Sequence, residues 1–149
     1  MTGRAVAYPL AALVVPAAWW LVGRRRGSRY PFALDILLVL PFLIDVVGNA
    51  LDLYDSISWW DDANHLVNWA ILTAAFGQAI VRRPLPRVVL FGLCLGFGAV
   101  TAILWEFLEY FTFIRNSPEL RTAYTDTLGD LALGTTGSAI AAFVTARLA

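Results

Sequence analysis

The chain has 149 residues, of which 59% are hydrophobic and 15% charged, and its basic and acidic residues cancel to no net charge. Soluble domains average about 45–50% apolar and roughly 25% charged residues, and a domain of this size cannot hide so much apolar surface from water. The composition therefore excludes a disordered chain, argues against a soluble enzyme and offers no basic surface for nucleic acid. We expect an all-α integral membrane protein.

Five apolar runs approach or exceed the roughly 20 residues that a helix needs to span a bilayer. In chain order they cover 5–23, 31–51, 64–81, 88–113 and 127–148. Five spans use roughly 100 residues, so the loops are too short for a separate soluble domain. We therefore expect a single domain, residues 1–149, that folds as a polytopic transmembrane helical bundle with about five spans.

Arginine is distributed unevenly over the loops of this arrangement, and there is no lysine. Eight arginines would lie on one side of the membrane: Arg24, Arg25, Arg26, Arg29, Arg82, Arg83, Arg87 and Arg147. Only Arg4, Arg115 and Arg121 would lie on the other. Because loops rich in Arg stay in the cytoplasm, we expect a multi-pass protein of the plasma (inner) membrane, with its N-terminus outside and its C-terminus cytoplasmic. The arginines of the first loop are the expected partners of Asp35.

Most of the acidic residues gather at the opposite end of the expected bundle. Several are three or four residues from another polar group, a spacing that places both on one helix face. The groups are Asp45 in the second run, Asp61, Asp62 and His65 at the third, Glu106 and Glu109 in the fourth, and Asp126 and Asp130 at the fifth. Small residues lie deeper on the same faces, Gly92 and Ala102 in the fourth run and Gly134 and Gly137 in the fifth. Small residues let membrane helices approach closely, so we expect the acids to point into the bundle.

A charge inside a membrane costs at least about 2.5 kcal/mol on insertion scales, so this cluster needs protons, water or cations. Carboxylates with one imidazole suit Mg²⁺, Mn²⁺, Zn²⁺ or Fe, and a divalent metal ion of unsettled identity is the expected cofactor. The expected metal ligands are His65, Glu106, Glu109, Asp126 and Asp130. Asp62 or Asp45 is the expected catalytic base or further ligand, and Arg115 and Arg121 are expected to bind a substrate phosphate.

A structural interpretation of the same residues stays open. Asp61, Asp62 and Asp126 begin apolar runs, where an acid commonly caps a helix and favours its dipole. A single histidine such as His65 is also often a satisfied polar residue. Glu106 and Glu109 fit this interpretation least, because they lie inside a long apolar run, where ionisable residues are functional by default.

Three motifs carry a resemblance to known proteins. They are Trp-Asp-Asp-Ala-Asn-His at 60–65, Leu-Trp-Glu-Phe-Leu-Glu at 104–109 and Tyr-Thr-Asp-Thr-Leu-Gly-Asp at 124–130. Over roughly residues 31–142 the chain resembles the YjdF-like and VanZ-like small bacterial membrane proteins, which carry Asp-x-x-His, Trp-Glu-x-x-Glu and Asp-Thr-x-x-Asp in this order. The resemblance implies a similar membrane bundle and a similar polar site, without a particular activity.

The leading functional hypothesis is a metal-dependent envelope enzyme that acts on a lipid-borne phosphate group at the outer leaflet. The expected partners are membrane lipid and a lipid-linked substrate, with no nucleic acid and no indication of the oligomeric state. One alternative is an ion-coupled or proton-coupled membrane carrier. Another is a non-catalytic membrane subunit whose acids brace the bundle or a partner.

Overall fold

The computed structural model describes residues 2–149 and, of the side chains, those of residues 8–149. The long helices are α1 (Thr2–Ala18), α2 (Phe32–Ala50), α4 (Trp60–Ile80), α5 (Arg87–Glu109) and α6 (Ala123–Leu148). Shorter helical segments are η1 (Trp19–Gly23), η2 (Arg24–Arg26), α3 (Leu53–Ser56), η3 (Tyr110–Ile114) and η4 (Pro118–Arg121). The described residues contain no strand, which confirms the all-α fold class.

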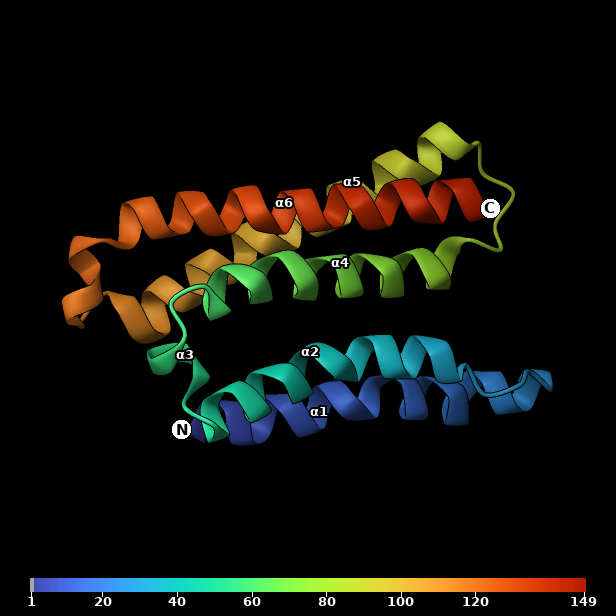
Figure 1. The fold of residues 1–149 in the computed structure, drawn as a ribbon. Coiled ribbons are helices and arrows are strands. Elements are labelled where there is room, and N and C mark those ends of the chain that lie inside the picture. Colours follow the sequence, from blue (N-terminus) through green and yellow to red (C-terminus); the bar gives the residue numbers. More distant parts are fainter. Residues whose placement is uncertain (1) are drawn as a thin grey trace.

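The long helices form two groups that run side by side (Figure 1). The first group is a hairpin in which α1 packs on α2. The second is a core of three helices in which α6 packs against both α4 and α5. Helix α2 joins the groups through its contact with α4. The candidate site belongs to the second group, so the packing of α4, α5 and α6 decides its geometry.

Small residues bring the three core helices together. A Cβ atom on Gly137 of α6 would collide with the carbonyl oxygen of Leu66 on α4, so only glycine permits this approach of the two backbones. A Cβ atom on Gly98 of α5 would collide with the side chain of Ser138 on α6. The expected packing role of Gly92 is wrong, because a Cβ atom there would meet nothing within 4 Å.

The buried face of each core helix repeats at a spacing of four residues, close to the helical period. On α5 it comprises Leu90, Cys94, Gly98, Ala102 and Glu106, which explains why Gly92 faces away from the core. On α6 the face includes Asp130, Gly134 and Ser138, and on α4 it includes His65, Trp69 and Thr73. Each face therefore ends in a titratable residue, and the three residues lie at the same end of the core.

Three helical stretches are long and apolar enough to cross a membrane: Phe32–Ala50, Arg87–Ile114 and Ala123–Leu148. Large apolar side chains such as Leu43, Leu104, Phe107 and Phe143 are more than half exposed on these helices, as lipid contact requires. Helix α4 has the length of a span but turns Asn64, His65 and Thr73 into the core, which lowers its hydropathy. That α1 and α4 also cross the membrane stays a prediction.

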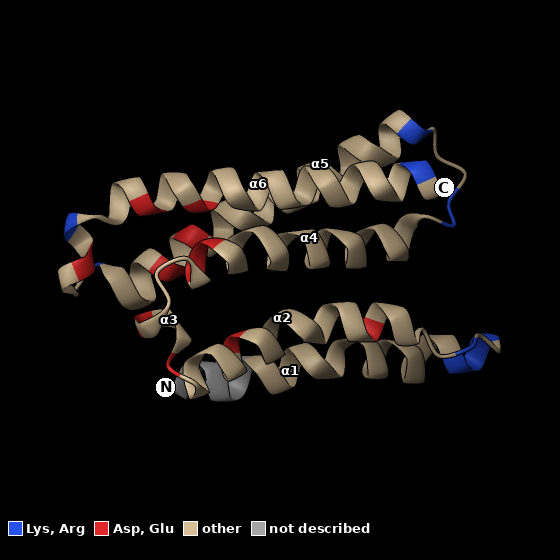
Figure 2. Ribbon diagram, in the orientation of Figure 1, with Lys and Arg blue, Asp and Glu red and all other residues tan. Residues whose placement is uncertain are grey.

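Most arginines lie at one end of the molecule and most acidic residues at the other (Figure 2). Arginines mark the turn between α1 and α2, the loop between α4 and α5, and the C-terminal end of α6. Acidic residues gather where α4 begins, α5 ends and α6 begins, and we call this the acidic end. The separation is the one that the positive-inside argument requires, while the orientation in the membrane stays a prediction.

Asp35 is an acid near the arginine end. Among the described side chains it forms no ion pair with arginine, contrary to the expected pairing with the first loop. Its Oδ2 accepts a hydrogen bond of 2.6 Å from the Tyr30 hydroxyl. This hydrogen bond, with the nearby negative charge, raises the pKa of Tyr30 to about 12. The Tyr30 phenol, two residues before α2, thus takes the place of the expected arginine as the partner of this carboxylate.

Candidate metal centre

His65 lies at the centre of the acidic end, in the second turn of α4, with 6% of its surface exposed. Its Nδ1 atom is 3.7 Å from Oε1 of Glu106 on α5. Its Nε2 atom is 3.6 Å from Oδ1 of Asp130 on α6 and 3.9 Å from Oδ1 of Asp61, one turn earlier on α4. One imidazole thus has carboxylates from three helices around it, on both sides of the ring.

The three residues on the buried faces are almost fully enclosed. Glu106 is 7% exposed and Asp130 is 3% exposed, and their contacts with His65 are longer than ordinary hydrogen bonds. His65 Nδ1 and Glu106 Oε1 are buried without any hydrogen-bond partner. An unsatisfied buried polar atom costs about 1–3 kcal/mol, so these two atoms, 3.7 Å apart, are candidate ligand atoms for one shared ion.

The side chains form two overlapping groups with the spacing of a metal site. One group is Asp61, His65 and Asp130, and the other is His65, Glu106 and Glu109. In each group the candidate ligand atoms lie within 4.8 Å of one another. Ligands bound at about 2.0–2.2 Å to one ion stand roughly 3–4 Å apart, so small side-chain movements would close either group around a cation.

His65 belongs to both groups, and each of its two ring nitrogens faces a different group: Nδ1 faces Glu106, and Nε2 faces Asp61 and Asp130. In metal sites the nitrogen that does not bind the ion commonly donates its hydrogen to a carboxylate, which fixes the tautomer and the ring orientation. Here either nitrogen has a carboxylate available for that purpose. The arrangement therefore fits one bound ion with an oriented histidine.

Two expected site residues of the third and fifth runs lie outside these groups. Asp126 is exposed and lies one turn before Asp130, in the first turn of α6. Asp62 is exposed as well, next to Asp61 in the first turn of α4. Both carboxylates remain at the acidic end, where they can interact with solvent or with a substrate.

Asp45 belongs to a different network, on α2. Its carboxylate accepts hydrogen bonds from the hydroxyls of Tyr8 and Tyr54 and from the Asn49 amide, at 2.5, 3.0 and 3.1 Å. These donors hold the α1–α2 hairpin to the segment that contains α3. Both oxygen atoms of the Asp45 carboxylate thus accept hydrogen bonds within this network.

The two candidate phosphate ligands are exposed arginines at the acidic end. Arg115 directly follows η3, and its guanidinium carbon lies 5.9 Å from the centroid of the Phe111 ring. Arg121 ends the 3-10 helix η4. Neither arginine forms an ion pair with Glu106 or Asp130 in the described part of the chain, so the buried carboxylates have no basic partner besides His65.

Asp61 was open to interpretation as a helix cap, and the structure places it beside His65 instead. Helix α4 begins at Trp60, four residues before the apolar run, so Asp61 lies inside the helix and not at its cap. The four-residue spacing to His65 is the sequence signal that marks this pair.

A groove connects Glu106 to the outer surface of the core. It has a volume of about 390 Å³ and lies where the last turns of α5, with η3, pass the first turns of α6. Its lining includes Glu106, Phe107, Phe111, Thr127 and Leu131. Glu106 thus lies between His65 on one side and an apolar groove on the other.

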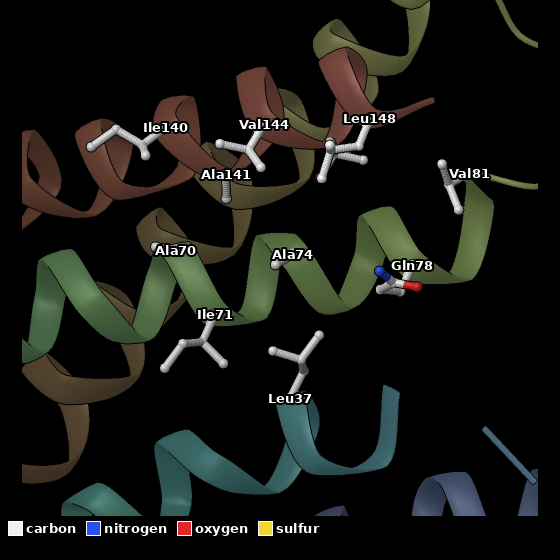
Figure 3. Close-up of a pocket in the computed structure, with 11 residues that line it drawn as sticks. Leu37, Ala70, Ile71, Ala74, Gln78, Val81, Ile140, Ala141, Val144 and Leu148 are labelled. Carbon is white, nitrogen blue, oxygen red and sulfur yellow. The ribbon is translucent and has the colours of Figure 1, made fainter. Parts of the chain in front are cut away.

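A second cavity, of about 350 Å³, lies between α2, α4 and α6, away from the acidic end (Figure 3). Its lining is aliphatic apart from Gln78 and Thr145, and it contains no titratable side chain. Figure 3 shows Leu37 of α2 and Ile71 of α4 pointing into the space between these helices. The cavity lacks the groups that catalysis or ion binding would need.

Comparison with known proteins identifies the family to which the chain belongs. No curated protein and no solved structure matches the chain. The family model described as "Predicted membrane protein (DUF2238)" matches residues 2–149, which is nearly the entire chain. This match supports the membrane assignment that the composition and the apolar helices indicate, and the chain belongs to the DUF2238 family of predicted membrane proteins.

Proposed function

We propose that the acidic end of the core binds a divalent metal ion and that the protein uses this ion to act on a phosphate-bearing membrane lipid. The observation that carries the proposal is the buried pair His65 Nδ1 and Glu106 Oε1, which face each other at 3.7 Å without hydrogen-bond partners. A cation between them would satisfy both atoms. As part of the same proposal, we infer that the chain is related to the YjdF-like and VanZ-like membrane proteins that it resembles in sequence.

The charge balance favours a cation over other forms of compensation. Glu106, Asp130 and the half-buried Glu109 place several carboxylates around one imidazole, and among the described residues none of the three forms an ion pair with an arginine. Burying ionised carboxylates without a counter-charge costs several kcal/mol each. A divalent ion removes this cost, and mixed imidazole and carboxylate ligands suit Mg²⁺, Mn²⁺, Zn²⁺ or Fe.

The proposed chemistry is hydrolysis or transfer at phosphorus. A bound divalent ion polarises a phosphoryl oxygen and lowers the pKa of a bound water, which supplies a nucleophile at neutral pH. Asp62 and Asp126, both exposed at the acidic end, would accept the proton from that water. Arg115 and Arg121 are the charge-assisted donors for the phosphate.

A carrier function has less support, because the polar residues do not continue through the core. Deeper than the centre, the buried polar groups are Thr73 and Ser138, which are fully enclosed. Beyond them Leu90, Cys94 and Ala142 form a buried apolar cluster, with Phe76 and Phe91 packed against it. An ion would have to pass this cluster without ligands.

The decisive experiment is the metal content of the purified protein after extensive dialysis. Wild type and Asp62→Asn are expected to retain a divalent metal, because Asp62 is exposed and outside both ligand groups. Glu106→Gln is expected to lose it. Addition of the ion at about 100 times its dissociation constant should also stabilise the wild type by about 2.7 kcal/mol, seen as a higher thermal midpoint.

Two results would count against this function. If the wild type neither retains a divalent metal nor gains thermal stability from Mg²⁺, Mn²⁺, Zn²⁺ or Fe²⁺, the acids only brace the helices. If Glu106→Gln binds metal as well as Asp62→Asn does, the centre around His65 is not the metal site.

A further inference from the structure

The groove between α5 and α6 is the opening through which Glu106 meets the outer surface of the core. Glu106 is 7% exposed, yet it lines this groove of about 390 Å³ together with mainly apolar side chains. The groove lies on α5 and α6, two of the helices that are long and apolar enough to span a membrane. We therefore expect lipid around the groove.

The wall of the groove includes a segment of π-helix. Tyr110 and Phe111, which line the groove, belong to η3, directly after Glu109. A π turn is wider than an α turn. Such turns are rare in proteins overall, and those that occur are often found at functional sites. Phe107 and Phe111 are both 58% exposed, so they present apolar rings at the groove's edge where a hydrocarbon chain can contact them.

A positive charge beside one of the lining residues favours an anionic occupant of the groove. Arg115 follows the π turn, with its guanidinium carbon 5.9 Å from the centroid of the Phe111 ring that lines the groove. A negatively charged headgroup between Arg115 and a metal ion at Glu106 would be bound from both sides. A neutral lipid would leave Arg115 without this interaction.

The direction of the groove fits a lipid whose head is at the acidic end. Its lining extends from Phe111 of η3 to Ile103 of α5, toward the middle of α5. Eight residues of helix rise about 12 Å, so an occupant reaches from the membrane interface into the hydrocarbon layer. Ile103 and Leu131 line the deeper part, where only an apolar chain can bind.

From these observations we infer that the groove is the substrate-binding site for an anionic phosphate-bearing lipid, whose hydrocarbon chain lies between Phe107, Ile103 and Leu131 and whose phosphate lies between Arg115 and Glu106. The inference rests on the proposed function, because the phosphate can approach the buried acids only when a metal ion balances their charge. The lipid enters from the side of the bundle, so it never leaves the membrane.

The test uses the full-length protein in nanodiscs of phosphatidylcholine that contain phosphatidic acid with a photoreactive acyl chain. Crosslinked residues are mapped by mass spectrometry in the presence of Mn²⁺ or Zn²⁺. We expect labelling at Ile103, Phe107 and Leu131. A diacylglycerol probe with the same photoreactive chain and no phosphate is expected to label these residues about tenfold less, which corresponds to about 1.4 kcal/mol.

Matched tryptophan variants test the position of the chain. Leu131→Trp and Ile103→Trp fill the groove, whereas Leu128→Trp and Leu104→Trp add the same bulk to exposed positions of the same helices outside its lining. The first pair is expected to lower labelling about tenfold and to retain the metal, and the second pair to leave both unchanged. The use of two helices keeps the test valid if one variant folds poorly.

The lipid site and the proposed function are contradicted by different results. Equal labelling in the groove-filling and control variants, or equal labelling by the two probes, would overturn the lipid site even if the metal is retained. A protein that holds no metal under any condition would overturn the proposed function, whereas groove-dependent labelling in that protein would show that the groove still binds lipid.

Discussion

Oδ1 of Asp130, on α6, lies 3.6 Å from Nε2 of His65, on α4. The two helices can bring these side chains together because Gly137, two turns farther along α6, lies against the backbone of Leu66 on α4. The geometry of the centre thus depends on a residue that contributes no ligand. The same dependence gives a way to disturb the centre without altering its chemistry.

Gly137→Ala is expected to destabilise the protein by about 1–3 kcal/mol, the usual cost of overpacking. The added Cβ atom collides with the carbonyl oxygen of Leu66, which is backbone and cannot rotate away. Helices α4 and α6 must separate, so Asp130 moves away from His65. Thermal unfolding in detergent measures the first effect, and metal content measures the second.

Gly129→Ala is the matched control on the same helix, since a Cβ atom there meets nothing within 4 Å. Replacing a glycine inside a helix by alanine should stabilise it by about 0.5–1 kcal/mol. The two substitutions are chemically identical, but their effects on stability should have opposite signs, because only the Cβ atom at position 137 collides with a neighbouring backbone. A Gly137→Ala protein as stable as Gly129→Ala would show that α4 and α6 do not pack as described.

The helices were predictable from sequence because their apolar runs are continuous, and each expected run overlaps one long helix over most of its length. Their starts were less predictable. Helix α4 begins at Trp60 and α6 at Ala123, each four residues before its run, because the first turns carry the polar side chains of the site. Hydropathy marks where a segment becomes apolar, and not where its backbone becomes helical.

Residue spacing predicts which side chains share a helix face, but it does not predict how deeply each side chain is buried in the core. Asp126 and Asp130 share one face of α6, but Asp126 lies one turn nearer to the N-terminus of the helix and is exposed. Asp61 and His65 have the same spacing on α4, and there both residues reach the centre. Asp45 could not be excluded from sequence, because its tyrosine donors come from the separate segments around Tyr8 and Tyr54.

Labelling of introduced cysteines tests the orientation in the membrane. Ser56 ends α3 and Ser117 precedes η4, both at the acidic end, whereas Ser28 lies beyond η2 at the arginine end. A maleimide that does not cross membranes should label Ser56→Cys and Ser117→Cys in intact cells and should not label Ser28→Cys. Native Cys94 is 0% exposed and should stay unlabelled. The reverse pattern would place the acidic end in the cytoplasm.

Titration of Tyr30 tests the contact at the start of α2. The hydrogen bond to Asp35 raises the pKa of Tyr30 to about 12 from about 10, so the folded state favours the protonated phenol. The contact therefore contributes stability below about pH 10 and loses it as the pH rises through about 12. The difference in tyrosinate absorption between wild type and Tyr30→Phe should appear near pH 12. In Asp35→Asn it should appear at lower pH, and an unchanged midpoint would contradict the contact.

The last prediction concerns the side of His65 on which the ion binds. His65 Nδ1 and Glu106 Oε1 are both buried without partners, whereas Asp61, near Nε2, is half exposed. We therefore expect the ion on the Nδ1 side, bound by His65, Glu106 and Glu109. Asp130 then accepts a hydrogen bond from Nε2 and orients the ring.

Four single variants distinguish the two sides: Glu106→Gln, Glu109→Gln, Asp61→Asn and Asp130→Asn. Loss of a residue that orients a ligand typically weakens metal affinity about 10–100-fold, so Asp130→Asn should fall in this range. Glu106→Gln and Glu109→Gln remove ligands and should weaken the affinity more, while Asp61→Asn should have the smallest effect. Metal affinity can be measured by titration with Mn²⁺ followed by electron paramagnetic resonance. If Asp61→Asn and Asp130→Asn instead lose the ion while Glu109→Gln retains it, the ion binds at Nε2, and Glu106 is the residue that orients the histidine.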